Sequence, residues 1–93
     1  MAIKHNVYED GKVQSLGFTT EEGNEATVGV LEAGTYNFGV AKRREEIKVL
    51  TGALSTLDGN TDWDSMTDPL VFEEGQTIEF NAAEGTSYLC IYG

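Results

Sequence analysis

Apolar and polar residues alternate along the middle of the chain. Every second residue of the segment 35–40 is apolar, in the order Tyr36, Phe38, Val40. After a basic turn, Lys42-Arg43-Arg44, the segment 45–50 alternates in the same way. Side chains of a strand point alternately to opposite faces of a sheet, so each segment predicts a half-buried strand.

Glu45 is the polar exception on the apolar face of the second segment. It has the same parity as Ile47 and Val49, so its carboxylate is expected to point inward. A carboxylate on an apolar face is unfavourable unless it is hydrogen-bonded or used in function. It is either a pocket carboxylate that binds hydroxyls or faces a positive charge, or a strand-end carboxylate paired with Arg43, Arg44 or Lys48.

Turn signals, most of them with glycine, divide the rest of the chain into short segments rich in β-branched and aromatic residues. No stretch keeps a helical period for three turns. This pattern predicts an all-β fold, either an antiparallel sandwich or a barrel. The expected strands are Lys12–Phe18, Glu25–Leu31, Thr35–Val40, Glu45–Leu50, Ala53–Leu57, Pro69–Phe72, Gln76–Phe80 and Ser87–Tyr92.

Length and charge restrict the possible partners. The 93 residues predict one domain, residues 1–93. Six basic residues against 16 acidic ones give a net charge of −10, which argues against binding nucleic acid or an anionic membrane surface. No apolar run has membrane-spanning length and the N-terminus lacks a secretory pattern, so a cytoplasmic location is expected.

The supply of histidine and cysteine excludes several kinds of site. His5, in an N-terminal segment that we expect to be mobile, is the only histidine, and Cys90 is the only cysteine. A His-rich zinc or iron site and a Ser-His-Asp or Cys-His arrangement therefore cannot form within one chain. We expect no metal, and we expect the Cys90 thiol to be buried in its apolar run.

Five segments carry a resemblance that covers nearly the whole chain: Gly11–Phe18, Ala26–Gly39, Glu45–Leu54, Thr61–Trp63 and Thr86–Tyr92. They resemble one known family, the small pyrimidine/purine nucleoside phosphorylases, which are single-domain cupins. The spacing from Glu45 to Gly52 is similar to the Glu and Gly of the first cupin motif. Phe38 and Val40 stand where the metal-ligating histidines of that motif would be, and the stretch Glu73–Glu84 is shorter than in relatives.

The resemblance implies an all-β, cupin-type antiparallel β-barrel, the double-stranded β-helix. It also implies an enzyme that cleaves purine and pyrimidine nucleosides with inorganic phosphate, giving the free base and ribose 1-phosphate without another cofactor. Small size and the resemblance together predict a homodimer, with the segment Ala2–Tyr8 or a sheet edge in the interface.

The chemistry of glycosidic cleavage suggests a role for each candidate site residue. Glu45 would hold the ribose hydroxyls and stabilise the cationic sugar ring. Aromatic residues would hold the base by stacking, and basic residues would hold phosphate. The alternatives are a non-catalytic cupin that binds a sugar or nucleoside, and a structural dimer with a filled barrel. The candidates are Tyr36, Phe38 and Tyr88 for the base, and Arg43 and Arg44 for phosphate.

Overall fold

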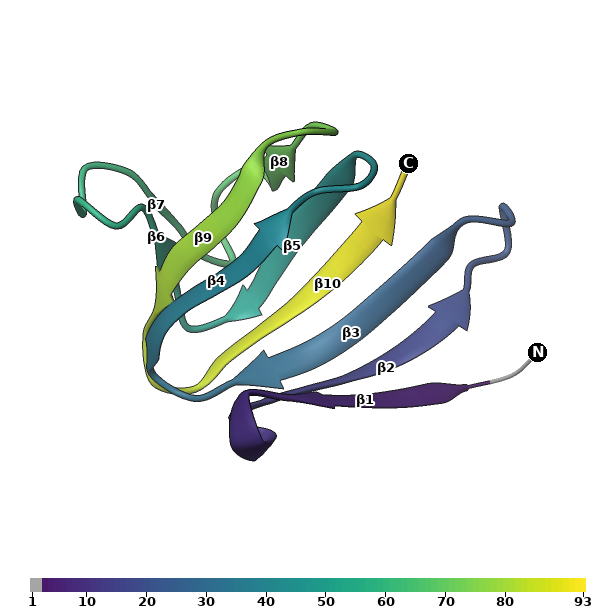
Figure 1. The fold of residues 1–93 in the computed structure, drawn as a ribbon, viewed down its shortest axis with the longest axis horizontal. Coiled ribbons are helices and arrows are strands. Elements are labelled where there is room, and N and C mark those ends of the chain that lie inside the picture. The colour runs from purple at the N-terminus through teal and green to yellow at the C-terminus, as the bar shows by residue number, and fades with distance from the viewer. Residues whose placement is uncertain (1–2) are drawn as a thin grey trace.

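The computed structural model describes residues 3–93 as two antiparallel β-sheets that face each other (Figure 1). The larger sheet contains, in spatial order, β1 (Lys4–Tyr8), β2 (Val13–Thr19), β3 (Glu25–Leu31), β10 (Thr86–Tyr92), β5 (Glu45–Thr51) and β8 (Leu70–Phe72). The smaller sheet contains β4 (Gly34–Val40), β9 (Thr77–Ala82), β6 (Leu54–Ser55) and β7 (Asp62–Trp63).

The all-β prediction is confirmed for the described residues. Residues 3–93 include no α-helix, and a three-residue 3-10 turn, Glu9–Gly11, connects β1 to β2. No helix in this part of the chain is long and apolar enough to cross a membrane. Each expected strand appears, although the one expected at Ala53–Leu57 is reduced to β6.

The arrangement of the sheets differs from the closed barrel that the resemblance implies. The strand pairings stay within each sheet, so the hydrogen-bonded ladder does not run continuously around the molecule. The larger sheet ends at β1 and β8, and the smaller one ends at β4 and β7. Two of these edge strands, β7 and β8, contain only two and three residues. The edge strand β1 leaves one side of the larger sheet free.

The N-terminal segment is ordered where we expected mobility. Residues from Lys4 to Tyr8 form β1 and pair with β2 in a continuous antiparallel register, from Lys4↔Gly17 to Tyr8↔Val13. This segment has no strong hydrophobic alternation. It can still form a strand because an edge strand can be held mainly by backbone hydrogen bonds to its neighbour. Ala2, which belongs to the interface predicted above, lies outside the described residues.

The facing surfaces of the two sheets bury a shared hydrophobic core. In β5, Ile47 and Val49 are 6% and 1% exposed, which confirms the inward parity predicted for this segment. The smaller sheet contributes Tyr36 and Phe80, both 4% exposed. Burying each such apolar side chain stabilises the packing of the sheets by roughly 1.5–3 kcal/mol.

Candidate functional site

A cavity of about 760 Å³ lies between the two sheets. The inner face of the larger sheet carries the small residues Ser15, Gly17 and Thr27 at this point, where a sandwich core usually has large apolar ones. Phe38 and Phe80 line the cavity from the smaller sheet. The missing side-chain volume leaves a pocket of the size that binds small organic molecules.

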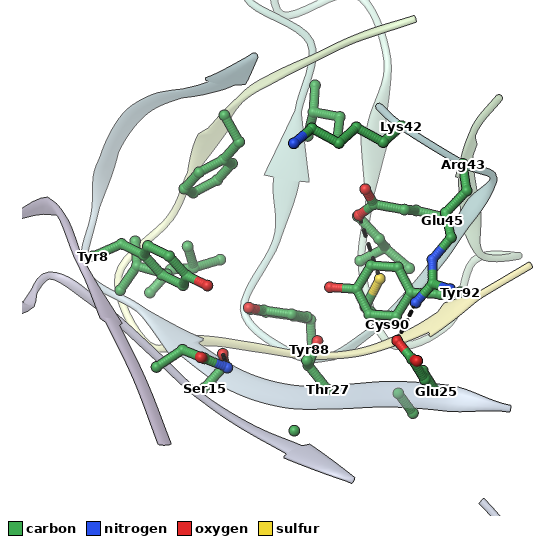
Figure 2. Close-up of a pocket in the computed structure, with 18 of the residues that line it drawn as sticks. Tyr8, Ser15, Glu25, Thr27, Lys42, Arg43, Glu45, Tyr88, Cys90 and Tyr92 are labelled. Atoms are coloured by element: carbon green, nitrogen blue, oxygen red, sulfur yellow. Dashed lines mark hydrogen bonds and ion pairs between the residues drawn. The ribbon is translucent and has the colours of Figure 1, made fainter. Parts of the chain in front are cut away.

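Glu45 lies in this cavity, at the first position of β5 (Figure 2). It is half-buried and sits opposite Tyr92 of β10 and Phe72 of β8 in the sheet register. Cys90, which is 2% exposed, donates its thiol proton to Oε1 of Glu45 across an Sγ–O distance of 3.6 Å. Glu45 forms no ion pair with the part of the chain that the structure describes. Its environment is therefore that of a pocket carboxylate.

The protonation states around Glu45 follow from burial. Desolvation raises the pKa of the Glu45 carboxyl, and the Cys90 hydrogen bond and the Arg43 charge oppose part of that rise. Burial and the Glu45 charge raise the pKa of the Cys90 thiol to about 12. At neutral pH Cys90 is therefore a protonated donor to Glu45 and not a nucleophile.

Two cationic side chains reach the cavity from the turn between β4 and β5. Arg43 forms an ion pair with Glu25, and its Cζ lies 4.8 Å from the centre of the Tyr92 ring. Lys42 also lines the cavity, and it forms no ion pair with residues 3–93 (Figure 2). One end of the cavity thus combines the Glu45 carboxylate with positive charge.

Arg44, a candidate for phosphate binding, lies outside the cavity. Its guanidinium approaches Glu46 at 3.5 Å and Glu73 at 3.6 Å. Arg44 directly precedes β5 and has the parity of Glu46, its ion-pair partner outside the cavity, whereas Arg43 has the parity of Glu45. Lys42, which the sequence analysis did not select, takes the place beside Arg43.

The aromatic candidates are also divided. Phe38 and Tyr88 line the cavity, whereas Tyr36 is buried in the core and donates its hydroxyl proton to the Glu32 carbonyl at 2.6 Å. The Tyr36 and Phe38 rings are stacked, with their centres 5.8 Å apart and an interplanar angle of 4°. Tyr36 therefore supports Phe38 from within the core.

Further polar residues in the cavity were missed by the sequence analysis. Asn6, Ser15 and Thr27 line it from β1, β2 and β3, and Cys90 and Tyr92 line it from β10. The alternation of β2 contained one usable signal, because Ser15 shares the inward parity of Val13. Polar or small residues on a buried parity indicate a pocket, but only the register shows which of them meet.

No group of three or more His, Cys, Asp and Glu side chains among residues 3–93 is arranged to hold a metal ion. His5 hydrogen-bonds to Gln14, which lies diagonally across from it on β2, on the outer face of the sheet. The absence of a metal from the working protein stays a prediction that elemental analysis can check.

Comparison with known proteins identifies the family. The model described as "pyrimidine/purine nucleoside phosphorylase" matches residues 3–92. Proteins of that name from Yersinia enterocolitica and Yersinia pestis are 42% and 43% identical, each match covering 97% of both chains. A crystal structure of a Vibrio parahaemolyticus protein of unknown function is 33% identical over 98% of both chains, with a TM-score of 0.83. One from Acidithiobacillus ferrooxidans, 20% identical, shares the fold over 97% of this chain and 89% of its own, with a TM-score of 0.73. The chain therefore belongs to the pyrimidine/purine nucleoside phosphorylase family.

Proposed function

We propose that this protein cleaves purine and pyrimidine nucleosides with inorganic phosphate, releasing the free base and ribose 1-phosphate. The observation that carries the proposal is the position of Glu45, an inward carboxylate without an ion-pair partner among the described residues. Positive charge at the same end of the cavity can bind phosphate, and the aromatic rings along the cavity can stack on the base. Family membership supports the same reaction.

Glu45 is the proposed stabiliser of the sugar. As phosphate bonds to C1′ and the bond from C1′ to the base nitrogen breaks, positive charge develops on the ribose ring. A fixed carboxylate in a partly water-excluded site stabilises that charge more in the transition state than in the ground state. The Cys90 thiol orients the Glu45 carboxylate, because it donates to one oxygen and leaves the other free for the ribose hydroxyls.

Lys42 and Arg43 are the proposed phosphate ligands. Both side chains line the cavity at the Glu45 end, so they can hold the phosphate close to C1′. Charge-assisted hydrogen bonds to a phosphate are among the stronger polar interactions in proteins. Inorganic phosphate enters as the co-substrate, and the proposal contains no other cofactor and no metal.

Phe38 and Tyr88 are the proposed contacts for the base. They project from opposite sheets, which allows a flat ring to lie between them. Stacking and apolar contact act on the face that every base has, so such a site accepts both purines and pyrimidines.

We also propose that the two facing sheets are an open variant of the cupin fold and that the protein is a homodimer. The Glu45-to-Gly52 spacing supports the first proposal. The free edge of β1 supports the second, because among residues 3–93 β1 pairs with β2 alone and exposes Val7. An unprotected edge strand in so small a domain favours pairing with a second copy.

The test is a base-release assay across a panel of nucleosides, with and without phosphate. We expect base and ribose 1-phosphate in equal amounts when phosphate is present, and neither product when it is omitted. Chelators are expected to leave the rate unchanged. Release that does not depend on phosphate would instead indicate a hydrolase.

The second candidate function is a non-catalytic module that binds a nucleoside or sugar. One contact favours it, since the Arg43 guanidinium is already paired with Glu25 and would have to exchange that partner for phosphate. Saturable nucleoside binding by the parent protein without any product, at all phosphate concentrations, would support this candidate and remove the enzyme.

A further inference from the structure

Asn6, Ser15, Gly29 and Tyr88 form a single row across the inner face of the larger sheet. The register pairs Asn6 with Ser15, Ser15 with Gly29, and Gly29 with Tyr88. Directly opposed residues of neighbouring strands are close enough for their side chains to interact. The row brings an amide, an aliphatic hydroxyl and a phenol together at one place in the cavity.

Gly29 allows the Tyr88 ring to lie flat on the sheet. A Cβ at position 29 would lie 2.7 Å from the Tyr88 hydroxyl oxygen and 2.8 Å from Cζ. The ring therefore occupies the space above Gly29, and its hydroxyl extends toward Ser15. Figure 2 shows Tyr88 on the cavity floor, between Ser15 on one side and Cys90 and Tyr92 on the other.

Asn6 and Ser15 are joined by a side-chain hydrogen bond within the row. Nδ2 of Asn6 donates to Oγ of Ser15 at 3.4 Å, so Ser15 accepts this hydrogen bond and keeps its own proton to donate. A hydrogen bond from Ser15 opposes part of the effect of burial, which raises the pKa of Tyr88 to about 12. Burial keeps the phenol protonated at neutral pH, and no described residue accepts that proton in a hydrogen bond, so it is available to a ligand in the cavity.

This neutral end of the cavity lies at a useful distance from Glu45. Tyr88 and Tyr92 are four residues apart on β10, which is about 13 Å along a strand, and Tyr92 is opposite Glu45. A nucleoside is long enough to place its ribose near Glu45 while its base reaches toward Tyr88. The two polar ends of the cavity therefore match the two parts of one substrate.

We propose that the Tyr88 hydroxyl donates a hydrogen bond to the departing base, with Ser15 and Asn6 as positioning residues; this inference rests on the proposed function. When the C1′–N bond breaks, its electron pair goes to the base, and the negative charge spreads onto ring nitrogens and exocyclic oxygens. Tyr88 stabilises that charge without giving up its proton, and water protonates the base after release. Purines and pyrimidines all offer acceptors, so one donor serves both classes.

The first test compares Tyr88→Phe with the parent on two substrates. Uridine loses its base as an anion, whereas 7-methylguanosine loses a neutral base and has little need of a donor. We expect kcat/KM to fall about 100-fold for uridine and less than about threefold for 7-methylguanosine. An equal loss on both substrates, or no loss on uridine, would overturn the proposal.

Tyr36→Phe is the matched control, because its hydroxyl bonds to the Glu32 carbonyl and Tyr36 does not line the cavity. It is expected to leave the ratio of the two rates unchanged. Ser15→Ala should lower kcat/KM for uridine about tenfold and leave that for 7-methylguanosine nearly unchanged, since Tyr88 keeps its proton but loses its orientation. A uniform effect of Ser15→Ala on both substrates would contradict its positioning role.

Calorimetric titration with free uracil separates this inference from the proposed function. If the parent shows no phosphorolysis, the proposed function fails, and the donor is then judged by binding alone. We expect uracil to bind Tyr88→Phe about tenfold more weakly than the parent. Equal affinities, or no binding to a parent that melts cooperatively, would overturn the donor role.

Discussion

At the scale of single residues, parity predicted one inward-facing carboxylate and could not predict its surroundings. The alternation of the segment 45–50 was enough to place Glu45 on the inner face, where the structure has it. The partner of Glu45 is Cys90, which comes from β10, far away in the sequence. The choice between Arg43 and Arg44 depends on how the turn after Val40 is built, which the run of basic letters does not reveal.

Cys90→Ala tests whether the thiol tunes Glu45. The Cys90 hydrogen bond lowers the pKa of Glu45, so its removal should raise that pKa further. If the ionised carboxylate is the active form, the acidic limb of the kcat/KM profile should move to higher pH. Cys90→Ser keeps a hydrogen-bond donor, so the acidic limb of its kcat/KM profile should lie at the same pH as that of the parent. Superimposable profiles for the parent and Cys90→Ala would show that the contact does not affect catalysis.

At the scale of elements, the strands follow from the pattern and the turns follow from glycine. Alternation and turn signals located the strands of both sheets to within a few residues. They did not reveal β1, whose sequence KHNVY is mostly polar and is held by pairing with β2, nor the two-residue strand β7. Gly52 lies in a turn where both the positive φ and the close approach of Thr86 require a glycine.

Gly52→Ala is expected to destabilise the fold strongly. Gly52 has a φ of +73°, and a Cβ there would lie 2.5 Å from Oγ1 and 2.7 Å from Cα of Thr86. Thr86 is buried and donates to the carbonyls of Ala53 and Ala83, so it cannot move away. The positive φ alone costs about 1–3 kcal/mol.

Gly59→Ala is the control for that prediction, because Gly59 has a φ of +75° with no atom within 4 Å of its added Cβ. Chemical denaturation should show Gly52→Ala losing at least about 2 kcal/mol more than Gly59→Ala. Equal losses would mean that the contact with Thr86 is not a constraint.

At the scale of the whole molecule, the site depends on register, which the sequence does not state. Ser15 and Thr27 make room for the cavity only because their strands pair and because the large residues beside them point elsewhere. A shift of one residue in either strand would turn these side chains to the outer surface. The expectation of a closed barrel was wrong, because the pattern of strands along the sequence does not show whether the edge strands of the two sheets pair with each other.

Light scattering at micromolar concentration tests the proposed homodimer. We expect a mass of twice the 10.1 kDa of one chain. Val7→Lys places a charge on the free edge strand β1 and should shift the mass toward one chain. Asn24→Lys, which adds the same single positive charge at an exposed position of the loop between β2 and β3, is the control and should leave the mass unchanged. A parent protein with the mass of one chain at this concentration would contradict the proposal.

The most direct test of the account is the rate of phosphate-dependent base release by Glu45→Gln, which keeps the shape of the side chain and removes its charge. Glu46→Gln is the matched control, because Glu46 is the next residue on β5 and bonds to Arg44 outside the cavity. Glu45→Gln should remain folded and should melt at or above the parent's temperature at pH 7. Burial raises the pKa of Glu45, so its ionisation destabilises the native state as the pH rises.

We expect Glu45→Gln to lower kcat/KM by about 100-fold, or about 2.7 kcal/mol of transition-state stabilisation, and Glu46→Gln to stay close to the parent. A folded Glu45→Gln variant that releases base at the parent's rate would contradict the central claim.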